Sequence, residues 1–210
     1  MFSPWRRHPL SVLAAILALP ALCLDAASPI AAQTPSVASL AGQLLVASPS
    51  MGDPRFERTV ILMIRHDKDG AFGIVINRPV GERPLAALLE TLGEKDTTAT
   101  GNISIFAGGP VQPDVGFVVH STDYHRPTTL EVNARVAMTS SREILRDIGN
   151  GNGPQKSLIA FGYAGWAPGQ LEGELARRDW FVAPGETKLI FDEDRDKLWD
   201  AAFAQRTQDL

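Results

Sequence analysis

Polar and aromatic residues that could recognise a ligand gather in the segment FGYAGWAPGQLEGELARRDWF, residues 161–181. Its first part predicts a strand ending at Trp166, and Pro168 is expected at the first position of a helix. On that helix Gln170 and Glu174 are four residues apart, so their side chains should lie on one face and act together. A purely architectural corner between strand and helix is the competing interpretation.

Further polar residues stand at element ends elsewhere in the chain. The loop SMGDPRFERT contains Asp53, and the strand end INRP contains Asn77 and Arg78. Loops and strand ends present polar side chains without burying them unpaired. We therefore expect one ligand- or partner-binding cleft formed by Asp53, Asn77, Arg78, Trp166, Gln170 and Glu174. The local alternative is that Asp53 caps its own turn and Asn77 satisfies nearby backbone groups.

Motifs for catalysis are weak. The chain has neither a Gly-x-Ser-x-Gly elbow nor a Ser-x-x-Lys pair. A hydrolase-like acid/base site around Asp53, His120 or Glu174 is the alternative function. The segment HSTDYH spaces His120, Asp123 and His125 like a small set of metal ligands, but a satisfied histidine at a strand end is the favoured interpretation of His120. We expect a non-catalytic protein with no metal site and no cofactor.

Composition favours one globular domain. The 210 residues are 44% hydrophobic and 21% charged, and the formal net charge at pH 7 is −4. An acidic balance argues against non-specific binding to a phosphate backbone, and no helix-turn-helix pattern is present. The expected partner is therefore an unidentified protein, peptide or small ligand rather than a nucleic acid.

The first residues predict an export signal. Two arginines precede an apolar run and then small residues, so residues 1–32 are interpreted as a Sec-type signal peptide. Residues 33–40 predict a flexible tether, and residues 41–210 the folded domain. We expect a periplasmic or secreted protein that meets the membrane only through its leader. If translation began near Val37, the protein would be cytoplasmic and could act as a transcriptional regulator.

Apolar runs and turn residues along the domain predict an α+β fold with a mixed or antiparallel sheet. Strands are expected over 42–48, 58–66, 71–79, 102–111, 114–121, 128–132, 135–139, 156–166, 179–184 and 187–191. The turn residues DKDG should join the second and third strands into a hairpin. Helices are expected within 84–93, closed by Gly93; from residue 144 after a capping box at Ser140–Glu143, ended by the glycines and Pro154 of ILRDIGNGNGP; from Pro168; and over 194–206.

Five ordered motifs carry a resemblance to a known family. They are GQLLVASPSMGDPRFERTVILMIRHDKDGAFGIVINRP, GGPV, GFVVHS, FGYAGWAPGQLEGELARRDWF and LIFDEDRDKLWDAAF. With them the chain resembles the YqgE/AlgH family over about residues 40–205. The resemblance implies a single domain whose bifurcated β-sheet forms a pseudo-barrel with flanking helices. It also implies a regulatory role, because the family is described as transcriptional regulators without an established catalytic activity. A leader departs from the usual cytosolic pattern and favours an exported role.

Overall fold

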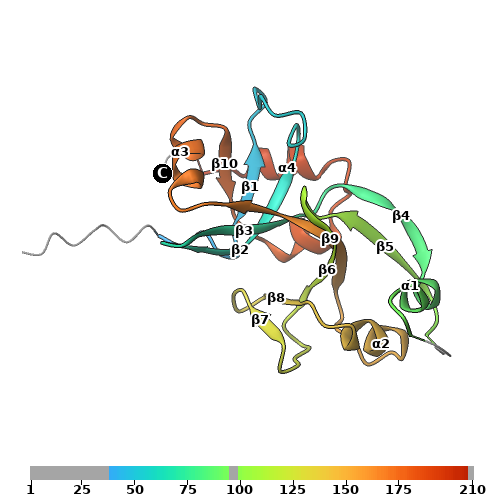
Figure 1. Cartoon of the computed structure of the whole chain (residues 1–210). Coiled ribbons are helices and arrows are strands. Elements are labelled where there is room, and N and C mark those ends of the chain that lie inside the picture. Colours follow the sequence, from blue (N-terminus) through green and yellow to red (C-terminus); the bar gives the residue numbers. More distant parts are fainter. Residues whose placement is uncertain (1–37, 95–98, 208–210) are drawn as a thin grey trace, which may run out of the picture. The chain divides into compact units, whose positions relative to one another are not determined.

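The computed structural model describes residues 38–94 and 99–207, which form one α+β domain. A curled, mostly antiparallel half-barrel sheet is its framework, with a few helices added (Figure 1). The strands are β1 (Leu44–Ala47), β2 (Val60–Asp67), β3 (Gly70–Val75), β4 (Pro79–Pro84), β5 (Asn102–Ala107), β6 (Val111–Ser121), β7 (Thr129–Glu131), β8 (Val136–Thr139), β9 (Ser157–Trp166) and β10 (Trp180–Ala183). The helical segments are α1 (Leu85–Thr91), α2 (Glu143–Gly149), α3 (Gln170–Ala176), the π-helix η1 (Lys188–Asp192) and α4 (Leu198–Ala204). The predicted signal peptide and most of the predicted tether lie outside the described residues.

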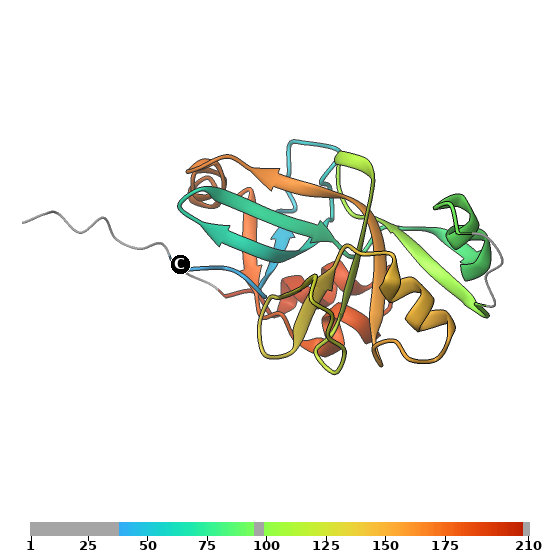
Figure 2. The same ribbon diagram turned by 60° about the horizontal axis from the view of Figure 1, so that its bottom comes forward.

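The bifurcation of the sheet occurs at β9. One edge of β9 pairs with β6 along most of its length, in antiparallel fashion. The other edge is divided: residues 159–161 pair in parallel with β5, and residues 164–166 pair antiparallel with β3. The β2–β3 hairpin and the antiparallel β4–β5 pair therefore extend from the same strand in different directions (Figure 2). The predicted α+β class with a bifurcated, mixed sheet is confirmed.

A glycine reverses the facing of side chains in the middle of β9. Before it, Leu158 and Ala160 face the larger hydrophobic core; after it, Tyr163 packs there, while Ala164 and Trp166 face a second core. Strict alternation would keep all even-numbered residues on one side. Gly162 lies between the two halves with φ +78°, a left-handed conformation that interrupts the alternation.

The Gly108–Gly109 corner after β5 packs directly against this interruption. Gly108 N donates to Phe161 O at 2.7 Å, and Val75 N donates to Gly108 O at 2.8 Å. The corner thus joins β3 to β9 by backbone hydrogen bonds. A Cβ atom on Gly162 would lie 2.4 Å from the carbonyl oxygen of Gly109. Gly162 and Gly109 must both lack a side chain, because the backbone of β9 and that of the corner are in direct contact.

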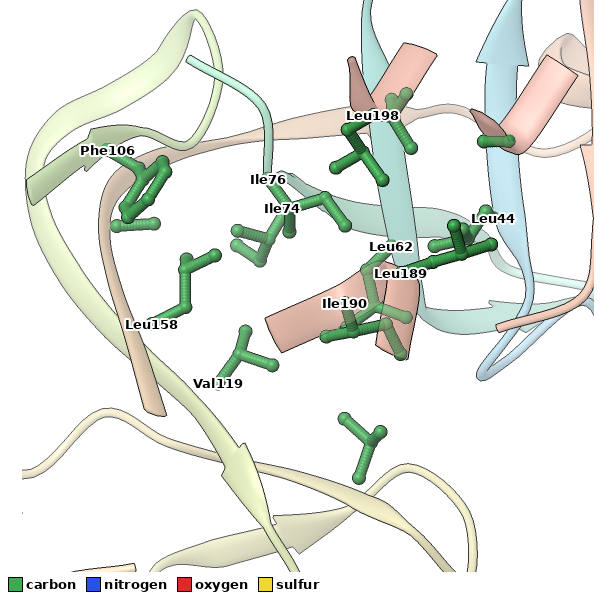
Figure 3. Packing of buried hydrophobic residues seen from close by; sticks show 14 of the residues in the cluster. Leu44, Leu62, Ile74, Ile76, Phe106, Val119, Leu158, Leu189, Ile190 and Leu198 are labelled. Atoms are coloured by element: carbon green, nitrogen blue, oxygen red, sulfur yellow. The ribbon is translucent and has the colours of Figure 1, made fainter. Parts of the chain in front are cut away.

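Two cores cover opposite faces of β1, β2 and β3. The inner core takes Leu44, Val46, Leu62 and Ile74, and the outer core takes Leu45, Ala47, Ile61 and Met63. Strands buried on both faces form continuous apolar runs, which explains the sequence pattern. Figure 3 shows the inner core, where Leu189 and Ile190 of η1 lie among Leu62, Ile74, Val119 and Leu158. The outer core lies under α3, through Leu171.

The strand predicted over 187–191 is wrong, because this segment forms η1. Leu189 and Ile190 are adjacent and both buried in the inner core, whereas a strand would point them to opposite faces. The outer edge of β10 is also occupied, since Thr207 N donates to Val182 O at 2.8 Å. A short apolar run alone does not distinguish a strand from a buried helical turn.

Several predictions about the ends and caps of elements differ from the structure. α3 begins at Gln170 rather than at Pro168, because Gly169 adopts φ +75° at the N-cap. The capping box expected before α2 is not formed: no side-chain cap hydrogen bond is made, and Ser141 Oγ donates to Glu143 instead. Leu40, which the sequence places in the tether, is buried in the outer core.

Gly162→Ala should destabilise the fold by about 3 kcal/mol or more, because it combines a left-handed backbone with a clash against Gly109 O. Gly52→Ala is the matched control, since a Cβ there meets nothing within 4 Å and its φ is not left-handed. Urea unfolding should leave this control within about 0.5 kcal/mol of the wild type. Equal stability of both variants would contradict the role of Gly162.

Candidate functional site

The corner between β9 and α3 is built by hydrogen bonds within a few residues. Trp166 ends β9, and Gln170 begins α3 after the left-handed Gly169. Gln170 Oε1 accepts a hydrogen bond from Ala167 N at 3.1 Å, and Gln170 N donates to Ala167 O at 3.0 Å. The amide side chain therefore closes the turn and fixes its own position at the corner.

Glu174 is the hydrogen-bonding centre of this corner. Its Oε2 accepts the indole N–H of Trp166 and that of Trp180, both at 2.8 Å. Its Oε1 accepts from Gln170 Nε2 at 2.9 Å. The predicted cooperation of Gln170 with Glu174 is confirmed by this contact. The two indoles are 8% and 3% exposed, so the carboxylate supplies the acceptor that their buried N–H groups require.

A cavity of about 380 Å³ opens beside Glu174; we call it the corner cavity. Its walls come from the loop before β2, the end of β9, the start of α3 and the start of β10. Four of the six predicted site residues line it: Asp53, Trp166, Gln170 and Glu174. The site thus joins residues that are more than 110 positions apart in the sequence.

Asp53 also caps its own turn, which is the local alternative given for it. Its Oδ1 accepts Arg55 N at 2.9 Å, and Oδ2 pairs with Arg55 Nη2 at 2.7 Å. The hydrogen bonds and charge of Arg55 lower the pKa of the Asp53 carboxyl below its ordinary value. Asp53 is therefore an ionised, already paired group on the rim of the corner cavity.

Asn77 and Arg78 do not line the corner cavity, so their predicted convergence with Gln170 and Glu174 is wrong. Asn77 Oδ1 accepts Val60 N, and its Nδ2 donates to Arg58 O, each at 2.9 Å. Arg78 Nη2 donates to Glu57 O and to Thr59 Oγ1. Both side chains satisfy the backbone where β2 begins, which is the local interpretation given for Asn77.

Residues that the sequence analysis did not single out complete the cavity. Trp180 supplies a second buried indole, and Phe56 lies 5.5 Å from it, centroid to centroid, at 71°. Arg177 and Asp179 form an ion pair of 2.9 Å on the rim. The only signal for Trp180 was its place in the DWF segment at the end of the opening motif.

His120 belongs to a separate, buried network. Its Nδ1 lies 2.9 Å from Ser121 O, and its Nε2 lies 2.9 Å from Thr139 Oγ1. Burial lowers the pKa of His120, so the neutral ring donates from Nδ1 and accepts at Nε2. His120 does not line the corner cavity. This is the satisfied strand-end histidine described as the alternative to a ligand.

The HSTDYH residues do not assemble as a metal site. Asp123 accepts hydrogen bonds from Ser121 Oγ and Gln155 N, and His125 faces Glu131 at 3.8 Å. Across residues 38–94 and 99–207 no three His, Cys, Asp or Glu side chains gather closely enough to bind a metal ion.

A second histidine attaches the start of the domain to α3. Leu40 N donates to His66 Nδ1 at 3.2 Å, so the proton of the neutral ring is on Nε2, which donates to Glu172 Oε1 at 3.0 Å. Glu172 therefore has a different hydrogen-bond partner from Glu174, and it does not line the corner cavity.

Glu174→Ala should lower the free energy of unfolding by about 2–4 kcal/mol, because two buried indole N–H groups lose their acceptor. Glu174→Gln keeps one side-chain oxygen and should cost only about 1 kcal/mol. Urea unfolding followed by tryptophan fluorescence measures both. If the two variants differ by less than about 0.5 kcal/mol, the acceptor role of Glu174 is wrong.

Comparisons with known proteins agree with the fold. Residues 44–210 match the model of the AlgH-like family, DUF179. A UPF0301 protein of Sphingopyxis alaskensis is 48% identical over 164 residues, covering 78% of this chain and 87% of the relative. One from Methylococcus capsulatus is 43% identical over 166 residues, covering 79% and 91%.

Two solved structures are also similar. The AlgH protein of Pseudomonas aeruginosa superposes with a TM-score of 0.68 at 42% identity, covering 78% of this chain and 86% of that one. A Corynebacterium diphtheriae protein superposes with a TM-score of 0.63 at 23% identity over 80% and 87% of the two chains, which shows the shared fold alone. The chain belongs to the AlgH-like family, also designated UPF0301.

Proposed function

We propose that the protein is a non-catalytic binding or regulatory module that receives a partner at the corner cavity. The observation that carries this proposal is the convergence of Trp166, Trp180 and Gln170 on Glu174 beside an open cavity of about 380 Å³. Aromatic walls with a few fixed polar groups are typical of recognition sites. The partner class stays open between a protein, a peptide and a small ligand.

The chemistry of the corner cavity favours binding over hydrolysis. Glu174 accepts from three N–H donors, none of which belongs to a histidine or hydroxyl group that could relay a proton. Asp53 is paired with Arg55, and its lowered pKa makes it a weak base. His120 is buried in a different part of the fold. These features support a binding module over the alternative of a hydrolase-like enzyme.

A nucleic acid partner is not favoured. Three carboxylates line the corner cavity (Asp53, Glu174 and Asp179) against two guanidinium groups (Arg55 and Arg177). A phosphate backbone requires the opposite balance. Together with the net charge of −4, this supports a regulatory role exerted through a protein, peptide or small ligand rather than through DNA.

We test the binding function by placing a photo-crosslinking amino acid at Arg177, whose exposed side chain lies on the rim. Irradiation of the producing cells should give discrete adducts, because a bound partner covers this position. Asp53→Asn and Glu174→Gln should each reduce the adducts at least several-fold without a large change in stability. The control position is Leu130 on β7, 48% exposed and outside the cavity. The same adducts at both positions, or adducts unaffected by these substitutions, would contradict the proposal.

We also propose that the protein acts after export. The support is the basic, apolar and small-residue order of residues 1–32. Among the described residues no helix has the length and apolar character needed to cross a bilayer. Cell fractionation followed by intact mass measurement should find the chain in the periplasm or medium, beginning after Ala32 or Ala27. A cytoplasmic protein with a mass that begins near Val37 would refute export and favour the transcriptional alternative.

A further inference from the structure

The corner cavity has a wall of three aromatic rings. Phe56 and Trp180 are 5.5 Å apart at 71°, and Trp180 and Trp166 are 6.1 Å apart at 80°. Each ring is therefore steeply inclined to the next, and all three residues line the cavity. The faces of aromatic rings carry negative potential, strongest for Trp, and attract cations.

The charges around the cavity do not cancel. Asp53 is paired with Arg55 at 2.7 Å, and Asp179 with Arg177 at 2.9 Å. Among the described residues no Lys, Arg or His lies within ion-pair distance of Glu174, and the three groups that donate hydrogen bonds to it are neutral. One negative charge is thus left facing the cavity without a cation.

Glu174 also keeps one acceptor position. A carboxylate offers about four lone-pair positions, two on each oxygen. Two indole N–H groups occupy Oε2, and the Gln170 amide occupies one position on Oε1. The remaining position on Oε1 can accept one further N–H. A cationic donor would form the strongest bond there, because charge-assisted hydrogen bonds are about twice as strong as neutral ones.

The chain already uses this chemistry on the rim. The Arg55 guanidinium pairs with Asp53 and lies 5.9 Å from the centroid of Phe56. A guanidinium between a carboxylate and an aromatic ring is therefore a compatible arrangement at the mouth of the cavity. Deeper in, Glu174 with Trp166 and Trp180 offers a carboxylate and rings of the same kind, without a cation of the chain's own.

We propose that the corner cavity binds the cationic side chain, arginine or lysine, of a basic peptide segment on the partner. This inference rests on the proposed binding function and specifies its ligand. The cation pairs with Glu174 at the free position on Oε1 and contacts the aromatic wall of Phe56, Trp166 and Trp180. Phosphorylated or acidic segments are disfavoured, since both arginines on the rim are already paired with aspartates.

The test is a titration of the full-length protein, isotopically labelled, with acetyl-Gly-Arg-Gly-amide to the solubility limit. The indole N–H resonances of Trp166 and Trp180 report binding, because both groups bond Glu174. We expect saturable shifts with the arginine peptide. The same peptide with citrulline, which has the shape of arginine without its charge, should bind at least about tenfold more weakly. A lysine peptide distinguishes ammonium from guanidinium recognition.

Glu174→Gln should weaken the arginine peptide at least about tenfold, while Glu172→Gln, on the same helix but outside the cavity, should leave its affinity unchanged. Equal binding of arginine and citrulline, or an unchanged affinity in Glu174→Gln, would overturn the inference. Absence of binding by any basic peptide would also overturn it. If the Arg177 adducts persist in that case, the binding function stands and only the cationic ligand is wrong; loss of both refutes both.

Discussion

The left-handed glycine in the middle of β9 is the constraint on which the other features depend. Before Gly162, β9 faces the inner core with its even-numbered residues and pairs with β5; after it, the facing is reversed and the strand pairs with β3. One strand thereby serves two halves of the sheet. The reversal also points Trp166 to the outer face, where α3 crosses, and so places the indole beside Glu174. Without it, Trp166 would face the inner core, and Glu174 would lose one of its two buried indole donors.

The sequence predicted those features that depend on local chemistry. Apolar runs indicated β1, β2 and β3, and the DKDG turn predicted the hairpin of β2 and β3. Helical spacing predicted that Gln170 lies beside Glu174. The segment that became η1 was missed because burial of Leu189 and Ile190 decides its conformation, and burial depends on strands far away in the chain.

The sequence predicted only part of the candidate site, again because contacts with distant parts of the chain decide the rest. Asp53 lines the corner cavity because the arrangement of the sheet brings its loop beside Gln170 and Glu174. Asn77 and Arg78 have the same polar character but satisfy backbone groups at the start of β2, which no spacing in the sequence reveals. The sequence does not single out Trp180, because its role in the site depends on a hydrogen bond to Oε2 of Glu174, the atom that Trp166 also bonds. Residue type suggests what a side chain can do, whereas its partners decide what it does.

A structural role and a recognition role are competing explanations for this corner, and the side chain of Glu174 distinguishes between them. The two indoles require an acceptor oxygen, and a glutamine would supply one without bringing a charge into a half-buried position. Packing therefore explains the oxygen but not the negative charge. A charge near the protein interior is usually matched by a cation. Even the more exposed carboxylates on the rim, Asp53 and Asp179, are matched by Arg55 and Arg177. The unmatched charge of Glu174 is the part of the corner that folding does not need, and a ligand of opposite charge accounts for it.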